Sequence, residues 1–373
     1  MLRALASADP AWPSRMPTDG ELEWLVKGGL GPLVHHLVPR SNLPLPDSWR
    51  ERLQSVDLVA RFEARRRMRH TEWALGLFRN AGIEATLLKG IAVATRYYPE
   101  PHLRAMGDVD LLIPDDAVPI AMQLLRNEGF TLSRFAEPEW WDTHHHAPPL
   151  IHPEREITIE LHHRLLPPNA VAKADPPFDL AMLDQRRFPT HVGEQLVFRL
   201  VPECEFALLV AAWGNDLSIF LGEPGLQRPL VDAVLLLAKT GDTFDWERLA
   251  RWTAGTTTGG LLWTLLTLLR RHAALPIRTA VFDSLRKPLR RHSRGTVHAA
   301  QYFVHRHVIG QRPFGRILTQ HTSTGVLRTL MARRPIVRRW LAVPLNILFP
   351  PANVRRFDLA FQLRRIASMF KTG

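Results

Sequence analysis

Two aspartates separated by a single residue, Asp108 and Asp110, are the strongest chemical signal in the chain. They lie in the apolar segment 107–112, GDVDLL, whose composition predicts a β-strand. Side chains alternate between the two faces of a strand, so both carboxylates point the same way and repel each other. A divalent cation that prefers oxygen ligands, Mg²⁺ or Mn²⁺, relieves that repulsion. Two exposed aspartates at the end of a strand are the alternative interpretation.

The segment 87–90, LLKG, indicates a second part of the same site. An apolar strand ends here and a helix begins, with Lys89 and Gly90 at the junction. Glycine lets the backbone approach a ligand closely, a helix N-terminus attracts phosphate, and lysine adds a positive charge. We therefore predict that Lys89 and Gly90 contact a bound nucleotide. An ordinary strand-to-helix turn has the same pattern and is the alternative.

Two further side chains extend the predicted site. Glu160 lies in the alternating segment 156–161, EITIEL, and is a candidate third carboxylate. Three carboxylates can hold two metal ions, which stabilise the attacking and leaving oxygens of a phosphoryl displacement. Arg104 stands in the loop just before the aspartates, where its guanidinium would reach a triphosphate. The alternatives are an exposed glutamate on a strand and a surface arginine.

Hydrophobic periodicity predicts the elements that must position these residues. Short apolar runs predict strands at 85–88, 108–113, 130–135 and 156–161, and helical spacing predicts helices at 49–80, 91–98, 115–128, 203–213, 229–239, 246–253 and 260–272. The first fifty residues show only weak periodicity. The expected order is therefore strand, helix, strand, helix, strand, strand, followed by helices.

The order of these motifs closely resembles the polymerase-β-like nucleotidyltransferase superfamily. The segments LLKG, YYPEPHLRAMGDVDLLIPDD and IELHHRL are similar to those of a bacterial family described only as uncharacterised nucleotidyltransferases. The resemblance is specific over about residues 70–166 and extends more loosely to about residue 270. The helix PLVDAVLLLAK, which contains Asp232, also looks like that family's helical region.

The resemblance implies an α+β fold, in which a small mixed β-sheet forms a nucleotidyltransferase core flanked by helices, with additional helical N- and C-terminal regions. We divide the chain accordingly into a helical N-terminal region (1–80), an α/β core (81–200), a helical region (201–275) and a basic, partly helical C-terminal region (276–373).

The resemblance also implies roles for individual residues. Asp108 and Asp110 match the superfamily's paired metal ligands. Glu160 matches the third carboxylate, which binds a metal and helps to deprotonate an acceptor hydroxyl. Gly90 matches the glycine on the phosphate side of the site. The chain departs from the usual pattern by having Lys89-Gly90 in place of Gly-Gly or Gly-Ser, by a longer interval before the aspartates, and by Glu where Asp is commoner.

Histidines form a last group of candidates. The run HHH at 144–146 suggests zinc, but adjacent residues rarely bind one metal, the chain has one cysteine, and it contains no HExxH motif. In the resembling family a histidine commonly stands in this segment, so His145 or His146 is expected to approach the active site. His162 follows Glu160 by two residues and would share its strand face. These three are predicted substrate or supporting residues.

The charge distribution points to an additional partner. The formal net charge is +12, yet beyond residue 265 the only acidic residues are Asp283 and Asp358. A basic region of this kind commonly contacts nucleic acid, an anionic membrane or an acidic protein. The segment 357–370 is predicted to form an amphipathic basic helix, which we expect to pack on the body of the protein, with contact to an anionic partner as the alternative.

Several classes of protein are disfavoured by what the sequence lacks. It has no GxSxG, Walker A or GxGxxG motif, no signal-peptide pattern at its N-terminus and no apolar segment of the roughly 20 residues that a spanning helix needs. With its single cysteine, Cys204, this predicts a cytoplasmic protein without a transmembrane segment, and peripheral contact with a membrane is the alternative.

The sequence thus predicts an enzyme that uses Mg²⁺ or Mn²⁺ to transfer a nucleoside monophosphate from an NTP to an unidentified hydroxyl acceptor. Two other hypotheses remain open at this point. One is a catalytically degenerate module that binds a nucleotide without chemistry. The other is a protein that binds RNA or a membrane surface through its basic C-terminal region.

Overall fold

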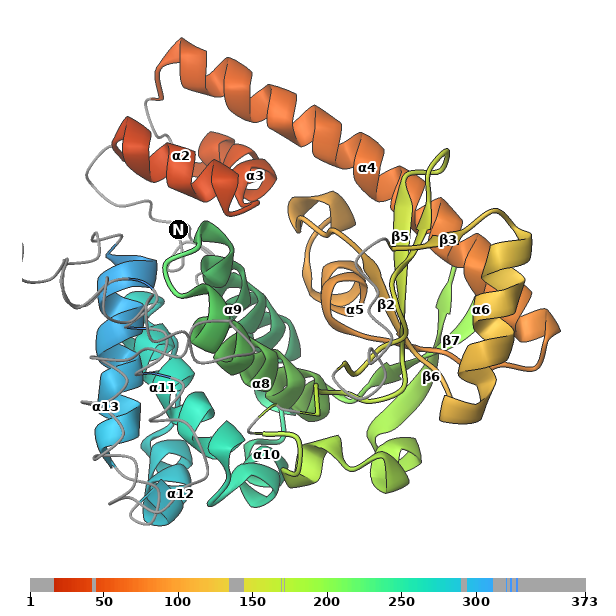
Figure 1. Ribbon diagram of the computed structural model, residues 1–373. Coiled ribbons are helices and arrows are strands. Elements are labelled where there is room, and N and C mark those ends of the chain that lie inside the picture. Colours follow the sequence, from red (N-terminus) through yellow and green to blue (C-terminus); the bar gives the residue numbers. More distant parts are fainter. Residues whose placement is uncertain are drawn as a thin grey trace, which may run out of the picture.

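The computed structural model describes residues 17–41, 45–133, 144–168, 170, 172–289 and 294–310, together with residues 320, 323 and 327. Within these residues one mixed β-sheet is flanked by many helices (Figure 1). The predicted α+β fold is confirmed. The candidate basic helix at 357–370 lies outside the described residues.

The sheet has the strand order β3-β4-β5-β2-β1-β7-β6. Its strands are β1 (Thr86–Leu87), β2 (Val109–Leu112), β3 (Thr131–Leu132), β4 (Leu150–His152), β5 (Ile157–His162), β6 (Arg187–Val192) and β7 (Gln195–Leu200). β2 runs parallel to β5 on one side and antiparallel to β1 on the other. The sheet therefore has its two carboxylate-bearing strands next to each other near its centre.

The register of β2 and β5 separates apolar from polar side chains. Val109 and Leu111 of β2, with Ile159 and Leu161 of β5, are fully buried in one hydrophobic cluster. That cluster also contains side chains of α4 (Asp47–Asn80) and α6 (Val118–Asn127), which cover this side of the sheet (Figure 1). Because strand side chains alternate, the even-numbered residues of both strands point to the opposite side.

That opposite side of the sheet faces the helices that follow residue 200, which we call the helical part. Leu112 belongs to a second cluster, which is formed mainly by helices after residue 200. These helices are α8 (Pro202–Phe220), α9 (Arg228–Thr240), α10 (Trp246–Thr253), α11 (Thr257–His272), α12 (Thr279–Leu289) and α13 (Arg294–Phe303), followed by a π-helical turn at Val304–Ile309. Helix α5 (Lys89–Tyr97) contacts both β2 and the helices α8 and α9. The polar face of the sheet is therefore flanked by α5 and the helical part.

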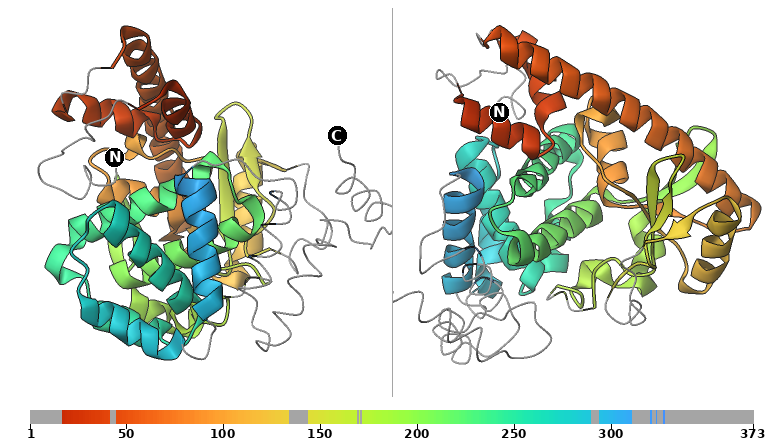
Figure 2. Two further views of the ribbon diagram at one scale, coloured as in Figure 1. Left: turned by 90° about the vertical axis from the view of Figure 1, so that its left-hand side faces the viewer. Right: turned by 45° about the horizontal axis from the view of Figure 1, so that its top comes forward.

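The N-terminal segment forms helices that weak periodicity did not reveal. They are α2 (Asp19–Lys27) and α3 (Gly31–Ser41), which pack together against the first half of α4 (Figure 2). Helix α2 begins with a capping box, in which the Thr18 hydroxyl accepts from the Glu21 amide and the Glu21 carboxylate accepts from the Thr18 amide. The spacing TDGE was the local signal for this helix.

The predicted strands at 85–88, 108–113 and 156–161 occur as β1, β2 and β5, with small shifts at their ends. The strand predicted at 130–135 is shorter in the described residues, where β3 covers Thr131–Leu132. Strands β4, β6 and β7 were not predicted, and Pro189 in β6 is one reason, because proline is usually excluded from strand interiors. No described helix is long and apolar enough to cross a membrane.

Candidate active site

Three carboxylates predicted from the sequence lie on the polar face of the sheet. Asp110 of β2 and Glu160 of β5 are direct partners in the parallel register. Asp108 precedes β2 by one residue and interacts electrostatically with both of these carboxylates. Asp110 is only 2% exposed, whereas Asp108 and Glu160 are half-buried. The two neighbouring strands thus bring negatively charged groups together at a largely buried position.

Asp110 receives two contacts on a single oxygen. The Lys89 ammonium Nζ lies 2.8 Å from Asp110 Oδ1, and His162 Nε2 lies 2.8 Å from the same atom. Burial by itself favours the protonated acid, but Lys89 and His162 outweigh it and hold the pKa of Asp110 well below its ordinary range. Asp110 is therefore ionised at neutral pH even without a metal ion.

Lys89 reaches this position from an unusual backbone conformation. It is the first residue of α5 and has φ of 45°, in the left-handed region that non-glycine residues rarely adopt. The preceding residue is fixed to the strand, because the Leu88 amide donates to the Asp110 carbonyl at 3.0 Å. Burial is the largest single effect and lowers the pKa of Lys89, but the combined attraction of Asp110, Glu160 and Asp108 exceeds it, and the net pKa is raised. Lys89 is a permanent cation of the site.

Asp108 differs from Asp110 in its protonation. Burial, followed by repulsion from Asp110 and Glu160, raises the pKa of Asp108 to about 6. Lys89 and His162 offset only part of this effect. The two aspartates of the motif therefore differ in their partners. Asp110 contacts Lys89 and His162, whereas Asp108 is left to bind a proton or a metal ion.

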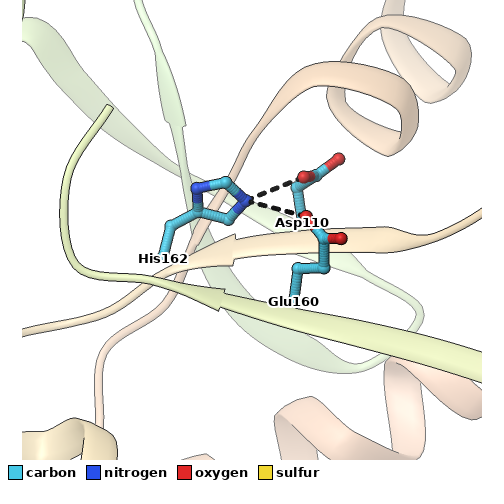
Figure 3. A group of neighbouring side chains, drawn as sticks. All are labelled: Asp110, Glu160 and His162. Atoms are coloured by element: carbon cyan, nitrogen blue, oxygen red, sulfur yellow. Dashed lines mark hydrogen bonds and ion pairs between the residues drawn. The ribbon is translucent and has the colours of Figure 1, made fainter. Parts of the chain in front are cut away.

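His162 completes a group that can bind a metal ion (Figure 3). One ligand atom each of Asp110, Glu160 and His162 lies within 4.8 Å of the other two. His162 is fully buried, and its Nε2 is 3.7 Å from Glu160 Oε2. Two carboxylates and an imidazole suit a divalent ion such as Mn²⁺, and the carboxylates also suit Mg²⁺. The donor set present therefore fits the predicted metal.

His145 and His146 approach the site beside His162. The His145 and His162 rings are 4.7 Å apart, and His146 forms an isolated β-bridge with His162. His146 Nε2 lies 3.6 Å from Glu160 Oε2. Burial is the main cause of a lowered pKa at both His145 and His146, so both rings are neutral at pH 7. Their neutral rings lie next to His162 and Glu160.

Arg104 and Gly90 pack against each other next to the carboxylates. A Cβ at Gly90 would stand 2.9 Å from Arg104 Nη1 and 3.2 Å from Met106 Cγ, so any larger residue here would displace these side chains. The other guanidinium nitrogens of Arg104, Nε and Nη2, donate to the Asp232 carboxylate at 2.9 and 2.8 Å. Arg104 thus bridges the N-terminus of α5 and helix α9.

Two acidic residues of the helical part belong to these surroundings but were not predicted as site residues. Asp232 is 1% exposed and also accepts a hydrogen bond from the Tyr98 hydroxyl at 2.7 Å. Asp216 of α8 has a pKa raised to about 6 by burial, an effect that Lys89 and Arg228 partly offset. Because both lie more than 100 residues from the DVD motif, no local spacing connects them with it.

A family model described as "Uncharacterised nucleotidyltransferase" matches residues 19–274. Among solved structures, an antigenic nucleotidyltransferase-like protein from Paracoccidioides brasiliensis is 18% identical, over 59% of this chain and 92% of that chain, with a TM-score of 0.34. No curated protein matches. The family model covers most of the chain, from α2 through the sheet to the end of α11, and the chain therefore belongs to the family of uncharacterised nucleotidyltransferases.

Proposed function

We propose that this protein transfers a nucleoside monophosphate from an NTP to a hydroxyl acceptor with the help of a divalent metal ion. The observation that carries the proposal is the register of β2 and β5, in which Asp110 and Glu160 are direct partners. Asp108 stands one residue before β2 and is close enough for both carboxylates to raise its pKa. Three carboxylates close together are costly unless cations neutralise them. A divalent metal ion would neutralise the carboxylates and at the same time bind the phosphates of a nucleotide.

The proposed reaction forms a bond between the acceptor oxygen and the α-phosphorus of the NTP. The bond from that phosphorus to the bridging oxygen of the β-phosphate breaks, and pyrophosphate leaves. A divalent ion held by Asp108, Asp110 and Glu160, with His162 as a nitrogen ligand, would neutralise charge on the phosphates. Glu160 is half-buried and is the carboxylate we assign to accept the proton of the acceptor hydroxyl.

The donor phosphates are assigned to the junction of β1 and α5. Because Gly90 has no side chain, Arg104 Nη1 packs against it there, while the other nitrogens of Arg104 are held by Asp232. Positioning of this kind supplies most of the rate in phosphoryl transfer, because the transition state carries its charge on oxygens that fixed cations can neutralise. The neutral rings of His145 and His146 would limit access of water from their side.

Thermal unfolding with nucleotides tests the assignment. Melting temperatures are measured with each of the four NTPs, with and without Mn²⁺ or Mg²⁺, for the wild-type chain, Asp108→Asn/Asp110→Asn and the exposed control Asp242→Asn. Ligands that bind the native state raise the melting temperature. A metal-dependent shift with one NTP that is lost only in the double variant supports the proposal. Equal shifts in all three proteins would place the nucleotide elsewhere.

A second candidate function is a module that binds a nucleotide without transferring it. The ion pair between Lys89 and Asp110 favours this candidate, because a protein cation already neutralises one predicted metal ligand. Pyrophosphate release separates the two functions. The enzyme releases pyrophosphate when a cell extract free of small nucleotides is added as a source of acceptors, whereas the module shows the thermal shift and no release.

A further inference from the structure

Oxygen Oδ1 of Asp110 is already saturated by protein groups. Lys89 Nζ and His162 Nε2 each lie 2.8 Å from it, and these two nitrogens are 3.5 Å apart. A carboxylate oxygen has two lone pairs, and here each has a partner. The ammonium therefore stands in contact with the ligand group of Asp110, Glu160 and His162, at a place that a divalent ion bound to this oxygen would need.

The backbone gives a second and independent indication that this contact matters. Lys89 has φ of 45°, a conformation that costs energy for any residue with a Cβ and that glycine adopts freely. The Leu88 amide donates a hydrogen bond to the Asp110 carbonyl, so α5 begins next to the aspartate. A glycine here would remove the strain and also the ammonium. Compared with glycine, a lysine at this position has a strained backbone but forms the ion pair with Asp110.

We propose that Lys89 is a resident cation that competes with the metal ion for Asp110 and thereby sets the metal affinity of the site. Without metal, the ammonium neutralises the buried aspartate. A divalent ion must displace it from Oδ1, and the displaced ammonium becomes free to contact an anionic group such as a donor phosphate. The inference rests on the proposed function, because it assumes that the same carboxylates bind metal.

The competition is measured by Mn²⁺ binding to the full chain, using isothermal titration calorimetry without nucleotide. Four proteins are compared: wild type, Lys89→Met, Lys89→Arg and Lys239→Met, which removes an exposed lysine on α9. We expect Lys89→Met to bind Mn²⁺ at least tenfold more tightly than wild type, because no ammonium has to be displaced and a like charge is gone. Lys89→Arg keeps the charge and Lys239→Met keeps the site, so neither gains affinity.

A second variant, Lys89→Gly, keeps the inference testable if Lys89→Met does not fold. Lys89→Gly removes the ammonium and relieves the left-handed strain, so it gains the same affinity for Mn²⁺ without a backbone penalty. Unchanged or weaker binding in both Lys89→Met and Lys89→Gly would overturn the inference and leave a metal-dependent transferase intact. Absence of Mn²⁺ binding in all proteins would instead refute the metal mechanism itself. The melting temperature of Lys89→Met without metal gives an independent readout, because it falls when Asp110 loses its partner and recovers with Mn²⁺.

Discussion

Arg104 and Asp232 form a two-point salt bridge between the loop that leads into β2 and helix α9. Both guanidinium contacts are shorter than 3 Å, and the carboxylate is almost completely buried. Paired donors of this geometry fix an arginine in direction as well as in place. The helical part of the chain therefore determines where the guanidinium lies relative to the start of α5.

Asp232→Asn tests this connection. Removing one charge of a buried pair leaves the other uncompensated, so we expect a loss of about 3 kcal/mol in the free energy of unfolding. Urea unfolding measures it, with the exposed Asp242→Asn as a control that should change stability by less than about 0.5 kcal/mol. Equal stability of the two variants would contradict a structural role for the pair.

Gly90→Ala should destabilise the protein although it lies in a helix. An alanine in a helix interior normally stabilises by about 0.5–1 kcal/mol relative to glycine, but here the new Cβ collides with Arg104 and Met106. We expect a net loss of about 1–3 kcal/mol and a smaller NTP-induced thermal shift. Gly20→Ala in α2 is the matched control, because its Cβ would meet only Thr18 Oγ1 at 3.9 Å. The prediction is wrong if both alanine variants gain stability.

The pKa of Asp108 predicts how stability depends on pH without metal. Its pKa is raised from 3.8 to about 6 on folding, so protonation favours the folded state. That contribution is fully present below pH 3.8 and is lost as pH rises through 6. The difference amounts to at most about 3 kcal/mol, and partial exposure of Asp108 reduces it.

Asp108→Asn removes this dependence on pH. Unfolding by urea in EDTA, measured between pH 5 and 8, should show the variant gaining stability relative to wild type as pH rises. Asp216→Asn is measured in parallel, because the pKa of Asp216 is also about 6. A constant difference between Asp108→Asn and wild type across this range would rule out the raised pKa. In the wild type, Mn²⁺ should stabilise more at pH 8 than at pH 5, because the ion competes with the proton.

His162→Gln tests the nitrogen ligand. Imidazole favours transition-metal ions over Mg²⁺, whereas carboxylates accept both. We expect the wild type to bind Mn²⁺ more tightly than Mg²⁺. In the variant, the logarithm of the ratio of the two affinities should fall to about half of the wild-type value or less. His191→Gln, on β6 away from the metal group, is the control. An unchanged ratio of the two affinities would show that His162 supports Asp110 without binding metal.

Much of the fold could be predicted because local patterns agree with it. The apolar runs around residues 87 and 110 become β1 and β2, and the helix predicted at 246–253 has the same bounds as α10. Three strands were missed. β6 and β7 pair with each other at one end of the sheet, and β4 lies between β3 and β5 near the other end. Their side chains alternate less clearly, and their pairing partners rather than their own periodicity make them strands.

The amino-acid pattern alone determined that Asp110 points away from the buried side chains of Val109 and Leu111, because strand side chains repeat every two residues. It also determined that Lys89 and Gly90 stand where a strand meets a helix. Only the tertiary structure decided that β5 lies beside β2 in the register that sets Glu160 against Asp110, and that Lys89 pairs with Asp110 while Asp232 holds Arg104. These contacts join residues between 21 and 128 positions apart. Their formation depends on hydrophobic packing of the whole chain, which no local periodicity encodes.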